Sequence, residues 1–188
     1  MTAVSTHLLR GLAVSVHNTR PEIATPAVLE RLERALGLID HYTPHYGRHL
    51  RRDFAGLRVE RYACRGAFFP DSRICLVELT FTVHPDISES EIAATILHEA
   101  MHARLHALGF PLEFQDRARQ ERFCRRAELE FGRLAPNGAR VIERAAGALA
   151  LADQEVAPEI DWQLAARRVA EADQAARKDV GPRENPRG

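Results

Sequence analysis

Apolar and polar residues alternate most regularly between Ile74 and Val83, which predicts a β-strand with one well-buried face. Shorter patterns of the same kind predict strands at Leu57–Tyr62 and Gly66–Phe69. Between the last two strands, Pro70–Ser72 has the residues of a turn. The three segments together predict a small, mainly antiparallel sheet of three strands.

Helical spacing of apolar residues appears on both sides of these strands. Pro26 after Thr25 suits a helix start, and Ser88 with Glu91 three residues later forms a capping box before another helix. The predicted helices are about Pro26–Tyr42, Glu89–Leu108, Glu113–Leu134, Arg140–Asp153 and Ile160–Lys178. Helices that flank the strands, and do not alternate with them, predict an α+β fold in which the sheet packs on the Glu89–Leu108 helix.

The remaining segments set the expected domain limits. Residues 1–25 show no clear period and predict a loosely attached arm, and Tyr42–Asp53 predicts a polar, basic connection. A compact domain is expected over residues 26–153. A charged helix follows within residues 154–188, and its tail, Val180–Gly188, is expected to be disordered.

The composition of the chain argues against several classes of function. The 188 residues carry 26 basic and 26 acidic side chains, so the chain lacks the basic excess of a general nucleic-acid binder or of a protein drawn to anionic membranes. No apolar stretch approaches the roughly 18 residues of a membrane helix. The only three cysteines, Cys64, Cys75 and Cys124, form no C-x-x-C motif, which favours a reducing, cytoplasmic location.

The chemistry is concentrated in the sequence His98-Glu99-Ala100-Met101-His102, an H-E-x-x-H motif inside the predicted Glu89–Leu108 helix. Histidines four residues apart lie on one helix face, so both imidazoles can reach one zinc ion. The intervening Glu99 points to the side, where it can take a proton from a metal-activated water. The motif therefore predicts His98 and His102 as ligands of one Zn²⁺ ion and Glu99 as the general base.

With this motif the chain resembles the zincin superfamily of zinc metallopeptidases over about Leu57–Leu134. The resemblance implies a peptide or protein substrate and makes residues 26–153 a zincin-like catalytic domain. Arg104 departs from the pattern, because an apolar residue is usual there. The metzincin extension is absent, since Leu105 and Leu108 stand where its glycine and third histidine belong.

A catalytic zinc needs a third protein ligand. Families of the gluzincin type place a glutamate on a following helix beside a small residue, and the resemblance implies Glu121 for this role, with Cys124 as the small neighbour. Glu128 is the reserve candidate, and a Cys124 thiolate is a further alternative. His106 lies two turns beyond His98, too far along a straight helix to join the same ion.

The resulting hypothesis is a zinc-dependent metallopeptidase in which Glu99 activates the attacking water. The residue that donates a hydrogen bond to the developing oxyanion is not identified by the sequence. The candidates are His106, Arg125 and Tyr62. In zincins the substrate lies as an extra strand along the edge of the sheet. The predicted Gly66–Phe69 strand resembles that edge strand. The alternative is a non-catalytic or regulatory zinc-binding module, and the Arg-rich Arg117–Arg126 segment leaves association with nucleic acid open for it.

Overall fold

The computed structural model describes residues 3–110, 116–157 and 161–179. The chain divides into two compact units, a main unit of Met1–Pro158 and a C-terminal unit of Glu159–Gly188. Among the described residues the strands are β1 (Ala3–Leu9), β2 (Leu12–Asn18), β3 (Gly56–Glu60), β4 (Gly66–Phe69) and β5 (Ile74–Glu78). The helices are α1 (Thr25–Tyr42), α2 (Pro44–Asp53), α3 (Leu79–Val83), α4 (Glu89–Ala107), α5 (Arg117–Leu134), α6 (Ala139–Leu149), α7 (Asp153–Val156) and α8 (Trp162–Asp179).

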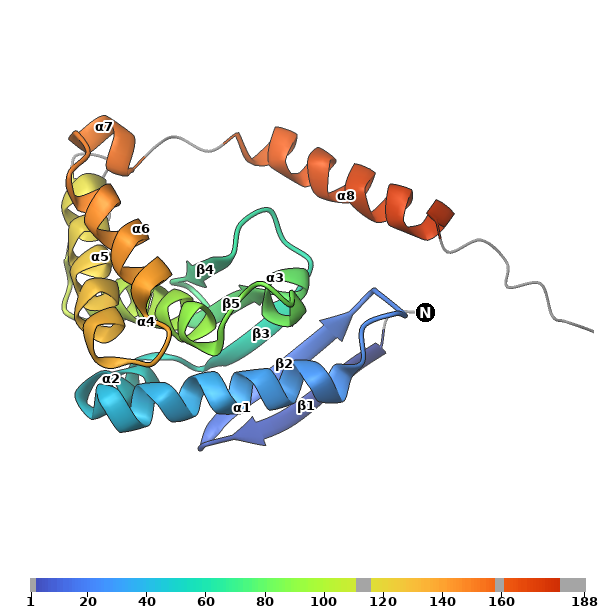
Figure 1. Ribbon diagram of the computed structural model, residues 1–188, viewed down its shortest axis with the longest axis horizontal. Helices are drawn as coiled ribbons and strands as arrows, with labels where there is room; N and C mark the ends of the chain where they lie inside the picture. Colours follow the sequence, from blue (N-terminus) through green and yellow to red (C-terminus); the bar gives the residue numbers. More distant parts are fainter. Residues whose placement is uncertain (1–2, 111–115, 158–160, 180–188) are drawn as a thin grey trace, which may run out of the picture. The chain divides into compact units, whose positions relative to one another are not determined.

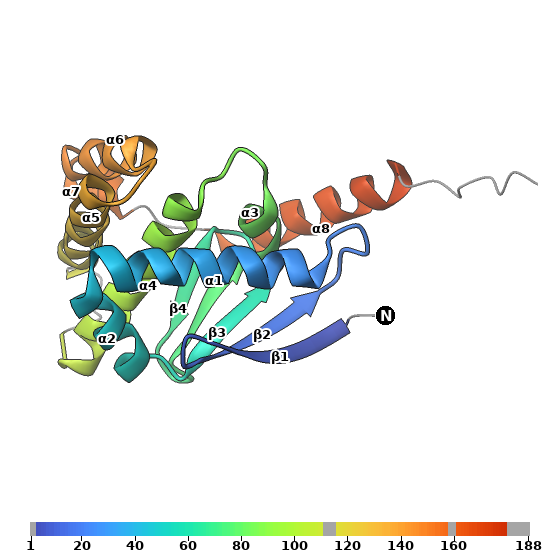
Figure 2. The ribbon, with the colours of Figure 1, turned by 60° about the horizontal axis from the view of Figure 1, so that its bottom comes forward.

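The fold is α+β, but its sheet is larger than the sequence indicated. The five strands lie in the order β1-β2-β3-β5-β4 (Figures 1 and 2). The pairs β2–β3 and β3–β5 are parallel, whereas β1–β2 and β4–β5 are antiparallel. The prediction of a small, mainly antiparallel, three-stranded sheet is therefore wrong. The parallel pairing of β2 with β3 requires a long crossover, which α1 and α2 supply.

The two additional strands come from the N-terminal segment. β1 and β2 form a hairpin whose two turn residues, Arg10 and Gly11, have φ of 47° and 78°. A turn with two positive φ angles usually carries Asn-Gly or Asp-Gly, so an arginine in the first position hid the signal. β2 then buries alternate side chains under α1: Leu12, Val14 and Val16. Residues 3–18 thus belong to the sheet, and the prediction of a loose arm over residues 1–25 is wrong for them.

β5 ends earlier than the alternation from Ile74 to Val83 predicts. β5 stops at Glu78, and the short helix α3 replaces the second half of the expected Ile74–Val83 strand. The Glu78 carboxylate accepts a hydrogen bond from the Phe81 backbone N–H at 2.6 Å, and Thr82 Oγ1 donates to the Glu78 carbonyl at 2.8 Å. These bonds favour a helical turn over a continued strand.

The segment after α1 is also helical. α2 replaces the polar connection expected over Tyr42–Asp53, and Pro44 occupies its first turn. Arg51 of α2 donates two hydrogen bonds of 2.7 Å to the Asp40 carboxylate of α1, so the two helices are joined by a bidentate ion pair. α1 begins at Thr25 itself, with Ala24 at the N-cap and no side-chain cap, so the expected Thr25 cap is absent.

α4 occupies the centre of the main unit. Its capping box is confirmed, because the Ser88 side chain accepts from the Glu91 N–H and the Glu91 carboxylate accepts from the Ser88 N–H. The helix contacts α1, α2 and α5 as well as β4 and β5. α1 and α4 share one hydrophobic core with one face of the sheet (Figures 1 and 2). The capping box sets where α4 begins, and this packing sets which of its side chains are buried.

α5 packs on α4, and α6 and α7 pack on α5. The predicted boundary between residues 153 and 154 falls at the start of α7, inside the main unit. In the C-terminal unit the Asp161 carboxylate accepts from the Leu164 N–H at the start of α8. The predicted starts at Glu113 and Ile160 and the tail Val180–Gly188 lie outside the described residues.

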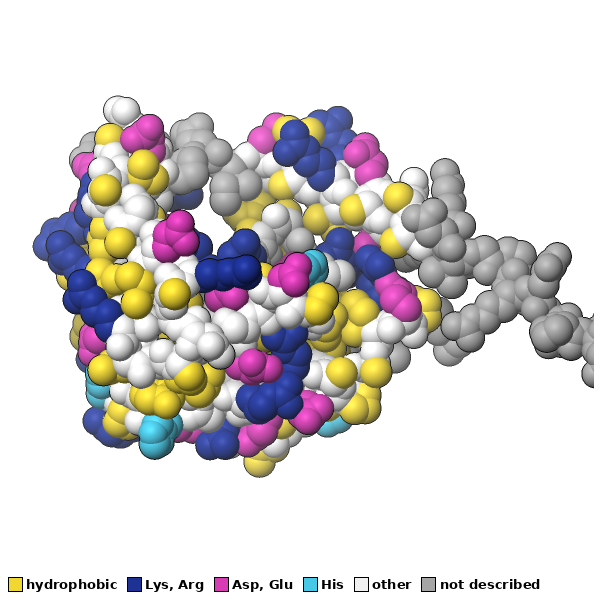
Figure 3. Space-filling model, viewed as in Figure 1, with side chains coloured by type: hydrophobic (Ala, Val, Ile, Leu, Met, Phe, Trp, Pro, Cys, Tyr) yellow, Lys and Arg dark blue, Asp and Glu magenta, His cyan; other side chains and the backbone are white. Residues whose placement is uncertain are grey.

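Acidic and basic side chains are interspersed over the face seen in Figure 3, in keeping with equal numbers of the two charges. None of the helices in the described part of the chain is long and apolar enough to span a membrane.

Candidate functional site

Two adjacent helices bring the predicted ligands together. α4 presents His98 and His102, and their Nε2 atoms lie 3.2 Å apart. From α5, the two oxygens of Glu121 approach them: Oε2 lies 3.3 Å from His98 Nε2, and Oε1 lies 3.3 Å from His102 Nε2. The three side chains therefore direct their donor atoms toward one another between the two helices.

The spacing of these donors fits zinc. Zinc–nitrogen and zinc–oxygen bonds of about 2.0–2.2 Å at tetrahedral angles hold neighbouring donor atoms about 3.3–3.5 Å apart. The separation of the two Nε2 atoms, 3.2 Å, and the 3.3 Å from each of them to one Glu121 oxygen are close to that requirement. Two imidazoles and one carboxylate are also the donor set of many catalytic zinc sites. The residues present thus fit a single Zn²⁺ ion.

Glu128 lies behind His98 instead of beside Glu121. Its Oε1 accepts a hydrogen bond of 2.6 Å from His98 Nδ1, the ring nitrogen that faces away from His102. The carboxylate is 1% exposed and also accepts from Arg125 at 2.8 Å and from Arg144 at 3.2 Å. A carboxylate on the outer nitrogen fixes the tautomer and orientation of a ligating imidazole. This contact makes Glu128 an orienting partner of His98.

The electrostatics of the cluster follow from these contacts. Burial lowers the pKa of His98, but hydrogen bonds to Glu121 and Glu128 outweigh burial and raise the pKa to about 10. The pKa of Glu121 and that of Glu128 are lowered despite burial, because both carboxylates bond to histidine. Without a cation the His98 imidazole therefore carries a positive charge beside the two carboxylates, and Arg125 and Arg144 supply further positive charge next to Glu128. A bound metal ion would take over that charge.

Glu99 lies next to this cluster and contacts the sheet. Its side chain is 7% exposed, and burial raises the pKa of its carboxyl, while His98 and His102 partly oppose the shift. A β-carbon added at Gly66 of β4 would lie 2.8 Å from Thr95 Cγ2 and 3.0 Å from Glu99 Oε1. Glycine thus allows the edge strand to approach the Glu99 carboxylate directly. A buried carboxylate with a raised pKa suits a general base.

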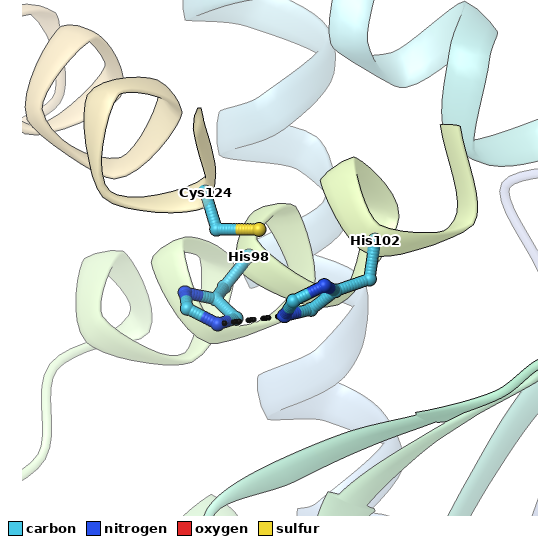
Figure 4. Close-up of side chains that lie close together, drawn as sticks. All are labelled: His98, His102 and Cys124. Atoms are coloured by element: carbon cyan, nitrogen blue, oxygen red, sulfur yellow. Dashed lines mark hydrogen bonds between the residues drawn. The ribbon is translucent and has the colours of Figure 1, made fainter. Parts of the chain in front are cut away.

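A buried thiol faces the histidines from α5. Cys124 is completely buried, and its Sγ and one ring nitrogen each of His98 and His102 all lie within 4.8 Å of one another. Figure 4 shows the Sγ atom directed from α5 toward the two imidazole rings. Burial and the nearby Glu121 carboxylate raise the pKa of this thiol well above its usual value. Its position is compatible with the alternative of a thiolate ligand.

The structure gives Arg104 a specific partner. Its guanidinium lies 3.9 Å from the buried carboxylate of Asp53 at the end of α2, so this charged side chain has an ion-pair partner. His106 lies against the Phe68 ring of β4, with centroids 6.0 Å apart. Of the expected oxyanion donors, Arg125 is bonded to Glu128 and Tyr62 packs edge-on against Phe69.

The sequence interpretation missed Arg144 and named Glu128 only as the reserve candidate for the third ligand. Arg144 comes from α6, sixteen residues beyond Glu128, and no local motif marks it. The role of Glu128 was only partly visible, because Glu121, Cys124 and Glu128 share one face of α5 by their spacing. Distinguishing a ligand from an orienting residue requires the positions of the two imidazoles.

No protein-family model, curated protein or solved structure matches the chain, so its function must be inferred from the geometry of this site.

Proposed function

We propose that the protein is a zinc-dependent metallopeptidase. The observation that carries the proposal is the convergence of His98, His102 and Glu121 at zinc-ligand spacing. Glu99, which lies between the two histidines in the sequence, supplies the base that peptide hydrolysis requires. The donor set favours zinc over calcium or magnesium, because those harder ions prefer oxygen ligands alone.

The proposed chemistry divides between the ion and the chain. Bound zinc acts as a Lewis acid that lowers the pKa of water and polarises the scissile carbonyl. Glu99 takes the proton of the attacking water and delivers it to the departing amine. Burial raises the proton affinity of this carboxylate, which supports the first transfer. Glu128 holds the His98 ring through Nδ1, which keeps Nε2 directed toward His102 and Glu121, where it could bind the ion.

The proposed substrate is an extended peptide or protein segment. β4 is the last strand of the sheet on the side of α4, and Gly66 brings it against Glu99. A peptide that pairs with the outer edge of β4 gains main-chain hydrogen bonds and passes the base. We also propose a reducing, cytoplasmic location, because Cys64, Cys75 and Cys124 are all free thiols.

Metal analysis tests the proposal first. We expect the purified protein to contain about one equivalent of zinc, as a site with three protein ligands requires. A chelator is expected to abolish peptide cleavage, and added zinc to restore it. Elemental analysis and mass spectrometry of a proteome-derived peptide mixture provide the two readouts. A protein that contains less than about a tenth of an equivalent after mild purification, and takes up no added zinc, would refute the proposal.

The close approach of β4 to Glu99 gives a second test. In Gly66→Ala the new methyl group collides with Thr95 and Glu99, so the strand or the carboxylate must move. A displacement of about 1 Å at a reacting group costs about 10²-fold in rate, and we expect a loss of this size in kcat/KM. Zinc content is expected to stay unchanged. The matched control is Ala67→Ser, which adds one heavy atom at the next position; equal activity of both variants would contradict the role of Gly66.

A further inference from the structure

The three cysteines differ in the hydrogen-bond partners of their thiols. Cys64 Sγ donates to the Gly66 carbonyl at 2.9 Å, and Cys75 Sγ lies 3.8 Å from the Leu76 carbonyl. The Cys124 thiol has no hydrogen-bond partner among the described residues, although it is completely buried. A buried thiol without a hydrogen-bond partner calls for an explanation. A metal ion bound to its sulfur is one such explanation.

The surroundings of Cys124 point to that explanation. Its Sγ is directed at His98 and His102 (Figure 4), within 4.8 Å of their donor atoms. Glu121 stands one turn earlier on α5, so both side chains face the same two imidazoles. Zinc bound by nitrogen and sulfur holds these atoms about 3.5 Å apart. The 4.8 Å limit exceeds this by about 1.3 Å, so ligation requires the Cys124 sulfur and the imidazoles to move closer together.

We propose that Cys124 is a fourth protein ligand of the metal ion in the resting protein. The inference rests on the proposed function for the presence of the ion and for the three other ligands. On ligation the thiol loses its proton to solvent, and the sulfur binds as thiolate. A site with four protein ligands is closed, whereas catalysis needs an open position. Release of Cys124 from the ion is therefore the step that makes the site available to water and substrate.

Cobalt substitution tests this ligand directly. Co²⁺ accepts the same donors as zinc, and a thiolate ligand adds a sulfur-to-cobalt charge-transfer band in the near ultraviolet. We expect the Co²⁺-loaded full chain to show this band and Cys124→Ser to lose it. The variant should still bind about one equivalent of Co²⁺ through His98, His102 and Glu121, with affinity lowered by more than the 10- to 100-fold that is typical of an orienting residue. Absorption titration measures the band and the affinity together.

Matched variants separate the outcomes. Cys64→Ser and Cys75→Ser are expected to keep the band, and circular dichroism checks that each variant is folded. A band retained in Cys124→Ser, or absent from a native chain that binds one equivalent of Co²⁺, would overturn the Cys124 ligand while leaving the metal site intact. A native chain that binds neither Co²⁺ nor zinc would overturn the metallopeptidase proposal as well. The failure of the ligand assignment is thus distinguishable from the failure of the proposed function.

Discussion

Glu99→Gln is expected to retain a full equivalent of zinc and to cleave peptides about 10²- to 10⁴-fold more slowly than the native protein. Glutamine has the shape of glutamate but cannot accept the proton of the attacking water. Burial already raises the pKa of Glu99, so the environment disfavours the charge that the substitution removes. We therefore expect the variant to be folded and at least as stable as the native protein.

The measurement compares native protein and variant on the same proteome-derived peptide mixture, with new termini counted by mass spectrometry. Glu89→Gln is the matched control, because Glu89 lies in the first turn of the same helix and pairs with Arg34 instead of the histidines. Its cleavage rate should equal that of the native protein. Cleavage by Glu99→Gln at the native rate would exclude Glu99 as the base.

The second large effect is expected at Glu121. Glu121→Ala removes the carboxylate that lies 3.3 Å from both imidazoles, leaving the two imidazole nitrogens and the proposed Cys124 thiolate for the ion. Loss of a ligand should weaken zinc binding by more than the 10- to 100-fold that is typical of an orienting residue. Glu128→Gln should stay within that smaller range, because its amide oxygen can still accept from His98 Nδ1. Competition with a chromophoric chelator measures both affinities.

The comparison decides which carboxylate binds the metal. Glu130→Ala serves as the control on the same helix, because its carboxylate is exposed and bonded to Tyr46, away from α4. It should bind zinc as the native protein does. If Glu121→Ala keeps native affinity while Glu128→Gln loses the metal, the two roles assigned here are reversed.

The parts of the fold that the sequence predicted well are those set by local interactions. The capping box at Ser88 and Glu91 requires only residues three apart, and the structure contains it. Gly66–Phe69 was predicted as a strand and forms β4. The predictions that were wrong depended on distant partners. Residues 3–9 become a strand because β2 pairs beside them, and β2 in turn pairs with β3 across α1 and α2.

The alternation from Ile74 to Val83 shows why periodicity alone was insufficient. Leu79 and Phe81 are buried, as in the predicted strand, but they lie in a helical turn whose start is capped by Glu78. The buried residues of α3 are Leu79, Phe81 and Thr82, so burial of two alternate positions does not by itself distinguish a strand from a helical turn. The hydrogen bonds of Glu78 decide between them, and they are a property of the folded structure.

By itself the sequence determined that two histidines and a glutamate share one helix, because helical periodicity fixes their relative directions. It also indicated that a donor would follow on the next helix. Only the tertiary structure decided how Glu121, Cys124 and Glu128 divide the space around the histidines. Contacts between α4 and α5 depend on the packing of the core, and spacing along one helix contains no information about the distance to another.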